Sequence, residues 1–159
     1  MVQKCQLFPL ASVEHWTGLR QQFHRYLAQE LVATRTLRLD LAAEEAFGFI
    51  SRAQHWPDFN FHGIRQISPC GDHLKFQSSC GNGSLTAEVK ERELRIDYSI
   101  FFEYEDCYEA GIRIFSISKG ECDLVISITK PRRMPISYFE NKLTLLDEGL
   151  ERLKQILEG

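Results

Sequence analysis

The C-terminal two thirds of the chain constrain its fold most strongly. Short segments of alternating apolar and polar residues run from about Phe61 to Lys130 without a helical pattern, and one long amphipathic segment, Ser137 to Glu158, follows them. Alternation of period two is typical of strands with one buried face. The order predicts a curved antiparallel sheet that grips a terminal helix. Such a sheet either packs solidly on the helix or leaves a hollow for a ligand.

Apolar residues at steps of three and four predict the terminal helix. They are Phe139, Leu143, Leu146, Leu150, Leu153 and Leu157. Ser137 and Glu140 have the spacing of a capping box, in which each side chain satisfies a free amide of the first turn. We therefore expect the helix to begin at this pair.

Seven strands are expected, separated mostly by turn-forming sequences. The first covers Thr34 to Leu41, and the others lie near residues 61–68, 73–80, 84–92, 94–103, 109–118 and 121–130. The clearest alternation predicts that Leu94, Ile96, Tyr98, Ile100 and Phe102 face inward, with Leu124, Ile126 and Ile128 from the last strand. In the sixth strand, Ile112 and Ile114 favour one phase while Phe115 and Ile117 favour the other. The sequence therefore does not decide which of these two sets faces inward.

Two helical patterns precede most of the sheet. Residues 12–32 carry a stripe that includes Trp16, Leu19, Phe23 and Leu27, which predicts a helix in an N-terminal extension, residues 1–33, ahead of a domain at residues 34–159. This stripe must be buried on the domain's own surface, over a cavity mouth, or on a protein partner or second subunit, and we favour the first. A short helix after the first strand should end before Trp56-Pro57.

Composition limits the partners. The net charge of −3 supplies no broad positive field, so nucleic acid is not expected. No apolar run approaches the about 20 residues that span a bilayer, and the N-terminus lacks the apolar core of a secretion signal. We expect a cytoplasmic protein without stable membrane insertion. Its five cysteines lack CxxC spacing, which favours reduced thiols.

This order of elements resembles the START-like, or SRPBCC, helix-grip superfamily over residues 34–159. The residues from Leu39 to Phe47 (LDLAAEEAF) resemble its first strand and helix, and those from Ala53 to Phe59 (AQHWPDF) resemble its aromatic corner. The resemblance implies an α+β helix-grip fold: a curved seven-stranded antiparallel sheet around a long C-terminal helix, here with an extra N-terminal helix. Members include polyketide cyclases and dehydratases, lipid and sterol transfer proteins, hormone-binding proteins and co-chaperone domains. The turn at residues 68–73 departs from the glycine-rich loop of the plant allergen branch.

Tyr98 is the first candidate for a polar ligand contact, because its hydroxyl lies in an inward row and needs a partner or a wet cavity. Ser116, with Ser78, could share that role. The aromatic side chains either line a hollow or fill a core. The full set predicted to line a cavity is Phe47, Ile50, Trp56, Phe59, Phe61, Phe76, Ile96, Tyr98, Ile100, Phe102, Ile114, Ser116, Leu143, Leu146 and Leu150.

No residue cluster predicts catalysis, a metal or a cofactor. His55, His62 and His73 fall on a corner, a strand and a turn without the short paired spacing of zinc ligands. The carboxylates of residues 103–109 are best interpreted as a solvated loop. The basic residues Lys130, Arg132 and Arg133 either attract an anionic head group at a cavity mouth or are simply solvated.

Three functions remain open. The leading hypothesis is a non-enzymatic protein that binds or transports a hydrophobic small molecule or lipid between the sheet and the terminal helix. The second is an enzyme of the cyclase or dehydratase type on a polyketide-like substrate, which would need a buried pair of polar groups within hydrogen-bond reach. The third is a co-chaperone-like module that binds a protein partner, or a homodimer, through the N-terminal helix.

Overall fold

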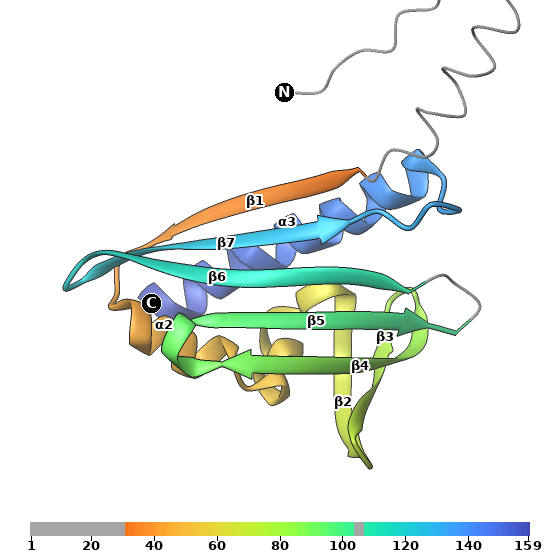
Figure 1. The fold of residues 1–159 in the computed structure, drawn as a ribbon, viewed down its shortest axis with the longest axis horizontal. Coiled ribbons are helices and arrows are strands. Elements are labelled where there is room, and N and C mark those ends of the chain that lie inside the picture. Colours follow the sequence, from red (N-terminus) through yellow and green to blue (C-terminus); the bar gives the residue numbers. More distant parts are fainter. Residues whose placement is uncertain (1–30, 104–106) are drawn as a thin grey trace, which may run out of the picture. The chain divides into compact units, whose positions relative to one another are not determined.

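The computed structural model describes residues 31–103 and 107–159, which form a seven-stranded antiparallel sheet with a long helix packed against it (Figure 1). The strands lie in the order β1-β7-β6-β5-β4-β3-β2. Their bounds are β1 Val32–Leu39, β2 Ile64–Cys70, β3 His73–Ser78, β4 Gly81–Lys90, β5 Arg95–Phe102, β6 Tyr108–Ser118 and β7 Glu121–Thr129. The helices are α2 Ala43–Ile50 and α3 Ile136–Glu158, with short 3-10 turns η1 Ala53–Phe59, η2 Phe61–Gly63 and η3 Glu91–Glu93.

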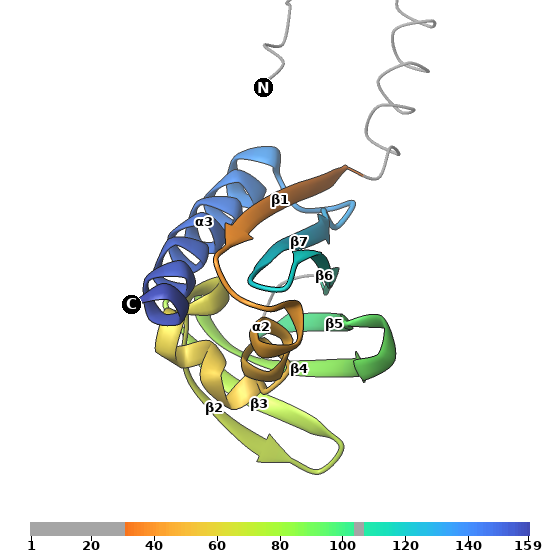
Figure 2. The ribbon, with the colours of Figure 1, turned by 90° about the vertical axis from the view of Figure 1, so that its left-hand side faces the viewer.

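The predicted α+β helix-grip architecture is confirmed for these residues. Helix α3 runs along one side of the sheet, and α2 and η1 lie on that same side (Figure 2). The first strand begins at Val32 rather than Thr34 and ends at Leu39. The predicted N-terminal helix, with its stripe from Trp16 to Leu27, lies outside the described residues.

The inner face of the sheet carries the predicted rows. Ile96, Tyr98, Ile100 and Phe102 of β5 are buried, as are Leu124, Ile126 and Ile128 of β7. The phase of β6 is now decided, since Ile112 and Ile114 are buried while Phe115 and Ile117 are 51% and 47% exposed. One element of the row differs from expectation: Leu94 is half-buried and precedes β5 in a left-handed conformation (φ 48°).

The start of α3 is set by backbone rather than by the predicted capping box. The helix begins at Ile136, Pro135 is its N-cap, and no side chain caps it. The carbonyl of Pro135 accepts hydrogen bonds from the amides of Tyr138 and Phe139. The prediction that Ser137 and Glu140 start the helix is therefore wrong, because Pro135, with φ −57°, is already in the geometry that proline favours before a first turn.

Polar contacts attach α3 along the edge of β1. The Arg35 guanidinium donates to Asp147 (2.6 Å), and the Lys154 ammonium donates to the carbonyl of Arg38 (2.6 Å). Lys130, at the end of β7, is buried, and its ammonium donates to the carbonyls of Pro131 (2.8 Å) and Met134 (2.7 Å). These contacts satisfy carbonyls that the sheet and the loop leave free. Lys130 thus stabilises the loop that joins β7 to α3.

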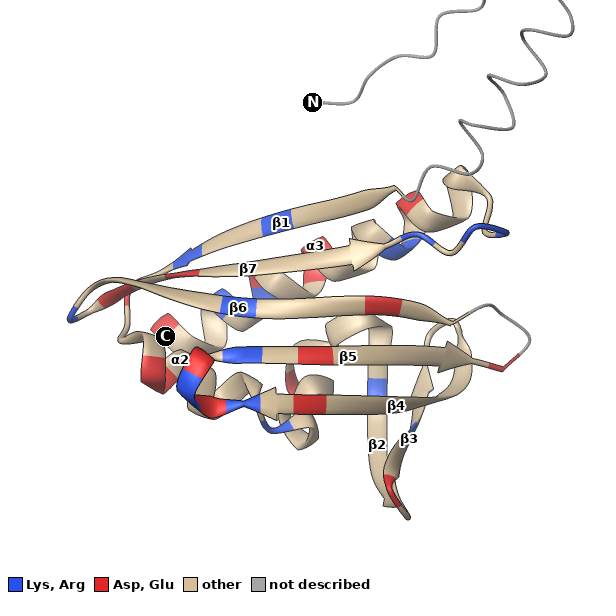
Figure 3. Ribbon diagram, viewed as in Figure 1, with Lys and Arg blue, Asp and Glu red and all other residues tan. Residues whose placement is uncertain are grey.

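Acidic and basic positions mingle on the outer face of the sheet (Figure 3). Asp97 of β5 accepts from Arg95 (2.8 Å) and from Lys90 of β4 (3.2 Å). Such partly exposed pairs each stabilise a fold by about 0–1 kcal/mol. The outer face is therefore a mixed-charge surface, and the burial that stabilises the fold lies on the inner side.

Candidate functional site

The site is built around a tight corner that leads into β2. Asn60 (φ 54°), His62 (φ 53°) and Gly63 (φ 74°) all have left-handed backbone conformations. The prediction of a strand from residue 61 is wrong at this point, because Phe61–Gly63 is a 3-10 turn and β2 begins at Ile64. A left-handed residue other than glycine costs about 1–2 kcal/mol, so surrounding contacts must hold His62 in place.

Helix α3 provides part of that support through Gly149. A Cβ atom built at Gly149 would lie 3.3 Å from the carbonyl oxygen of Phe59 and 3.4 Å from that of Asn60. The helix backbone thus approaches the corner closely, as only a glycine allows without displacing a neighbour. This contact between α3 and the corner helps to hold the backbone beside His62 in place.

His62 and Tyr98 form a buried hydrogen bond. The Nε2 atom of His62 lies 2.7 Å from the hydroxyl of Tyr98, and the two residues are 2% and 3% exposed. The ring of Trp56 packs edge-on against Tyr98 (centroids 5.1 Å apart), and the ring of Phe61 lies 4.3 Å from that of His62. The expectation that the Tyr98 hydroxyl needs a partner is met, and that partner is His62, for which the sequence predicts a position in a strand.

Burial keeps both members of this pair neutral. Desolvation, with a smaller contribution from the positive charge of Lys142, lowers the pKa of His62 from 6.5 to about 3. Desolvation also raises the pKa of Tyr98 well above its ordinary value of 10. At neutral pH the bond therefore joins an uncharged imidazole to an uncharged phenol, an arrangement suited to hydrogen bonding rather than to proton transfer.

A buried cation lies on the same inner side. Lys142 of α3 is 5% exposed, and its ammonium lies 3.9 Å from the centroid of the Phe102 ring and 5.0 Å from that of Tyr138. The sequence held a signal that we missed: Lys142 is three residues after Phe139 and four before Leu146, so it belongs to the buried stripe. Leu143, which the sequence predicts to lie in this stripe, is half-buried.

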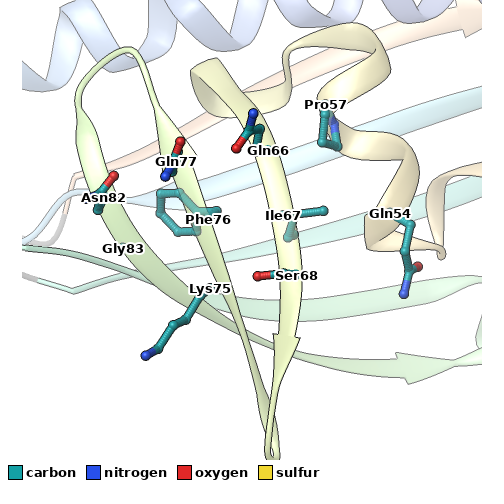
Figure 4. Close-up of a pocket in the computed structure, with 10 residues that line it drawn as sticks. All are labelled: Gln54, Pro57, Gln66, Ile67, Ser68, Lys75, Phe76, Gln77, Asn82 and Gly83. Carbon is teal, nitrogen blue, oxygen red and sulfur yellow. The ribbon is translucent and has the colours of Figure 1, made fainter.

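A pocket of about 640 Å³ lies between η1 and the curled end of the sheet (Figure 4). Its lining consists of Gln54, Pro57, Gln66, Ile67, Ser68, Lys75, Phe76, Gln77, Asn82 and Gly83. The ring of Phe76 packs edge-on against that of Phe102 (centroids 5.3 Å apart), and the ring of Phe102 lies 5.7 Å from that of Tyr108. The Lys142 ammonium lies over the same Phe102 ring. The rings of Phe76 and Phe102 therefore separate the pocket from Lys142.

Most residues predicted to line a cavity are buried on the inner side, with Phe76 also lining the pocket. Ser116 differs from the others. It is exposed, close to a register shift between β6 and β7, and its hydroxyl donates to the carbonyl of Ser118 (3.3 Å). Ser78 is half-buried and donates to the carbonyl of Gly81 (2.7 Å). Tyr98 is therefore the predicted polar contact that does reach the buried cluster.

The other two histidines among the residues that the structure describes lie apart from this cluster. His55 pairs with Asp58 (3.2 Å) and His73 with Asp72 (3.1 Å). Within residues 31–103 and 107–159, no three His, Cys, Asp or Glu side chains converge as metal ligands would. In the same residues, no helix is long and apolar enough to cross a membrane.

The titration of His62 should be visible in the pH dependence of stability. Its folded pKa, about 3, lies below the unfolded value of 6.5, so protons bind the unfolded chain better. The contribution of neutral His62 to the free energy of unfolding is complete above pH 6.5 and is lost as the pH falls toward 3. The expected loss between pH 7 and pH 5 is about 2 kcal/mol. We expect His62→Asn, which tolerates the left-handed backbone, to lack this loss.

Urea denaturation of both proteins at pH 7.0, 6.0 and 5.0 measures the effect. The carboxylates with lowered pKa values, such as Asp97 and Asp123, add their own loss only at more acidic pH. Identical slopes of unfolding free energy against pH for the two proteins would show that His62 does not titrate as a buried group.

Solved structures with the same architecture are numerous, although neither the sequence models of known protein families nor the sequences of curated proteins match this chain. The protein XoxI from Bacillus cereus aligns with a TM-score of 0.66 and 16% identity over 79% of this chain and 94% of its own. A START superfamily protein from Mycobacterium smegmatis aligns at 0.62 and 13%, covering 82% and 98%. The Zhui aromatase/cyclase from Streptomyces sp. R1128 aligns at 0.60 and 9%, covering 80% and 95%.

Residues 31–159 therefore have the helix-grip fold of START-like (SRPBCC) proteins, as the order of elements predicts. That fold is shared by structures described as START proteins and as aromatase/cyclases. Identities this low establish the architecture alone, so the function has to be argued from the site.

Proposed function

We propose that this protein binds a small hydrophobic molecule on the inner side of the sheet, between η1, the curled strands and α3. The ligand enters through the pocket beside η1, and its polar group bonds to the His62–Tyr98 pair. The observation that carries the proposal is this neutral, hydrogen-bonded pair inside an aromatic shell.

The pair is costly for a purely structural core. Burying an imidazole and a hydroxyl requires desolvation that one mutual hydrogen bond offsets only in part, whereas apolar side chains of similar volume would pack without that cost. The left-handed backbone of His62 adds strain to the same position. Buried polar groups and strain of this kind are characteristic of sites that recognise a ligand.

Access to the pair depends on Phe76. Its ring forms part of the pocket wall and contacts Phe102, which lies beside Tyr108 and Lys142. We infer that a ligand reaches the inner cluster by displacing the rings of Phe76 and Phe102, which separate the cluster from the pocket. The ligand therefore needs an apolar body thin enough to pass between η1 and β3.

A cyclase-type enzyme is the second candidate. Its stated requirement, a buried polar pair within hydrogen-bond reach, is met by His62 and Tyr98 at 2.7 Å. The lowered pKa of His62 argues for binding instead, because a base with a pKa of about 3 is almost never protonated by a substrate at neutral pH. Conversion of a bound polyketide-like substrate that His62→Asn abolishes without loss of binding would favour the enzyme.

Binding can be tested with the neutral fluorescent probe N-phenyl-1-naphthylamine, together with native mass spectrometry of gently purified protein. We expect saturable binding at one site. Ile67→Trp, which places an indole in the pocket, should weaken it by at least about tenfold, since a filled pocket cannot take up the probe.

Ile117→Trp is the matched control, because it adds the same indole at an exposed position away from the pocket lining. Its affinity for the probe should equal that of the wild type. The proposal fails if the wild type carries no small molecule and binds no probe, or if Ile67→Trp binds as well as the control.

A further inference from the structure

The loop between β7 and α3 carries two adjacent arginines, Arg132 and Arg133. Both are exposed, and within the described part of the chain neither guanidinium forms a hydrogen bond or an ion pair. The exposed Arg38 of β1, by contrast, pairs with Glu121 and Asp123. The two guanidinium groups of the loop are therefore free to bind an anion outside the protein.

Buried groups hold this loop in place. The ammonium of Lys130 donates to the carbonyls of Pro131 and Met134, and the side chain of Met134 is itself buried. These partners of Lys130 are carbonyls rather than carboxylates, so its positive charge is not neutralised by them. Residues 130–133 thus place three positive charges on a loop that is anchored to the fold.

Apolar side chains lie beside these charges. Ile136, the first residue of α3, is 44% exposed, and Val32, the first residue of β1, is exposed as well. The amide of Lys130 donates to the carbonyl of Leu31 (2.8 Å), so β1 begins next to the loop, at the end of the sheet where α3 also begins (Figure 1). Basic and apolar side chains together are typical of surfaces that rest on an anionic bilayer.

The charge of the loop differs in sign from that of the whole chain. The chain has a net charge of −3, so an anionic surface repels the protein on average. At the loop the balance is reversed, because the first carboxylate that follows it, Glu140, offsets only one of the three positive charges. A negatively charged membrane should therefore attract the protein by this end.

We propose that the β7–α3 loop and the first turn of α3 dock on the surface of an anionic membrane. Arg132 and Arg133 bind lipid phosphate groups, and Ile136 contacts the boundary of the acyl chains. This inference goes beyond the proposed function and does not rest on it, since it requires neither the pocket nor the His62–Tyr98 pair.

Sedimentation of the full-length protein with large vesicles tests the inference. One set of vesicles is pure phosphatidylcholine, and the other contains about 30% phosphatidylglycerol. At about 0.1 M salt we expect binding to the anionic vesicles to be at least about tenfold tighter than to the neutral ones. Raising the salt to about 0.5 M should weaken this binding, because exposed charges are then screened.

The double variant Arg132→Gln/Arg133→Gln should weaken binding to the anionic vesicles by about tenfold or more. Arg92→Gln/Arg152→Gln is the matched control, because it also removes two exposed arginines that have no ion pair among the described residues. Arg152 lies toward the other end of α3, so the control should bind as the wild type does.

The apolar contact has its own matched pair. Ile136 and Ile156 are each 44% exposed, at opposite ends of α3. Ile136→Ser should weaken binding by about fivefold without changing any charge, whereas Ile156→Ser should have no effect. Thermal melts of each variant verify folding. If the arginine double variant does not fold, the wild-type lipid and salt dependence and this isoleucine pair still decide the question.

The inference is overturned if the wild type binds both kinds of vesicle equally, or if the two arginine double variants lose binding to the same extent. It is also overturned if soluble glycerol phosphate displaces the protein from vesicles while Ile136→Ser binds normally, since the loop would then recognise phosphate rather than a membrane. Ile67→Trp, which fills the pocket, should bind vesicles normally, so failure of the pocket proposal and failure of this one are distinguishable.

Discussion

Replacing Leu146 with aspartate should leave no folded protein. Leu146 is almost completely buried where α3 faces the inner side of the sheet. An aspartate there must bury an unpaired charge, become protonated inside the core, or pull the helix away from the sheet, and each of these costs a large share of the about 5–15 kcal/mol that stabilises a typical domain. We expect Leu146→Asp to accumulate in inclusion bodies or to lack a cooperative thermal transition by circular dichroism.

Thr144→Asp controls for the charge, because Thr144 is exposed on the same helix. This variant should fold and melt within a few degrees of the wild type, in keeping with the small effect of surface substitutions. A soluble Leu146→Asp protein with a cooperative melt would refute the position of this helix face.

Gly83→Ala should cause the next largest loss. A Cβ at this position would collide with the backbone carbonyl oxygen of Phe101 and lie 2.5 Å from Cζ of Phe76. The glycine leaves room for the Phe76 ring to lie across β4 and reach Phe102. Since the backbone cannot move aside cheaply, we expect a loss of about 3 kcal/mol in unfolding free energy, measured by urea denaturation.

Gly48→Ala is the matched control. Gly48 lies in α2 and a Cβ there would have no heavy atom within 4 Å, so the change should instead stabilise the protein by about 0.5–1 kcal/mol. Equal effects of the two substitutions would mean that Phe76 does not pack over Gly83 as described.

Much of the fold could be predicted because its signals are local. The alternation in residues 94–102 fixes which side of β5 is buried, and the three- and four-residue steps from Phe139 to Leu157 fix the buried side of α3. Two predictions of element boundaries are wrong because a local pattern is not the only determinant of a boundary. The capping-box spacing predicts that α3 starts at Ser137, but Pro135 is its N-cap. The apolar start of the predicted second strand is a 3-10 turn, Phe61–Gly63.

The candidate site was predicted only in part. Tyr98 followed from its position in an inward row, but nothing in the sequence indicates that His62, 36 residues away, would be its partner. Lys142 did carry a signal, since it occupies the apolar stripe of α3, but charged side chains are rarely buried, so this position alone does not predict a buried ammonium.

Hydrophobic periodicity depends on neighbouring residues, so it predicts the order of strands and helices, the burial of β5 and α3, and with them the resemblance to helix-grip proteins. Which polar groups meet depends instead on how these elements pack in three dimensions. The left-handed backbone at His62, supported by the close approach of Gly149, brings an imidazole to Tyr98, and the curl of β2 to β4 beside η1 forms the pocket. Such contacts depend on how separate elements pack, and no spacing along the chain encodes that packing.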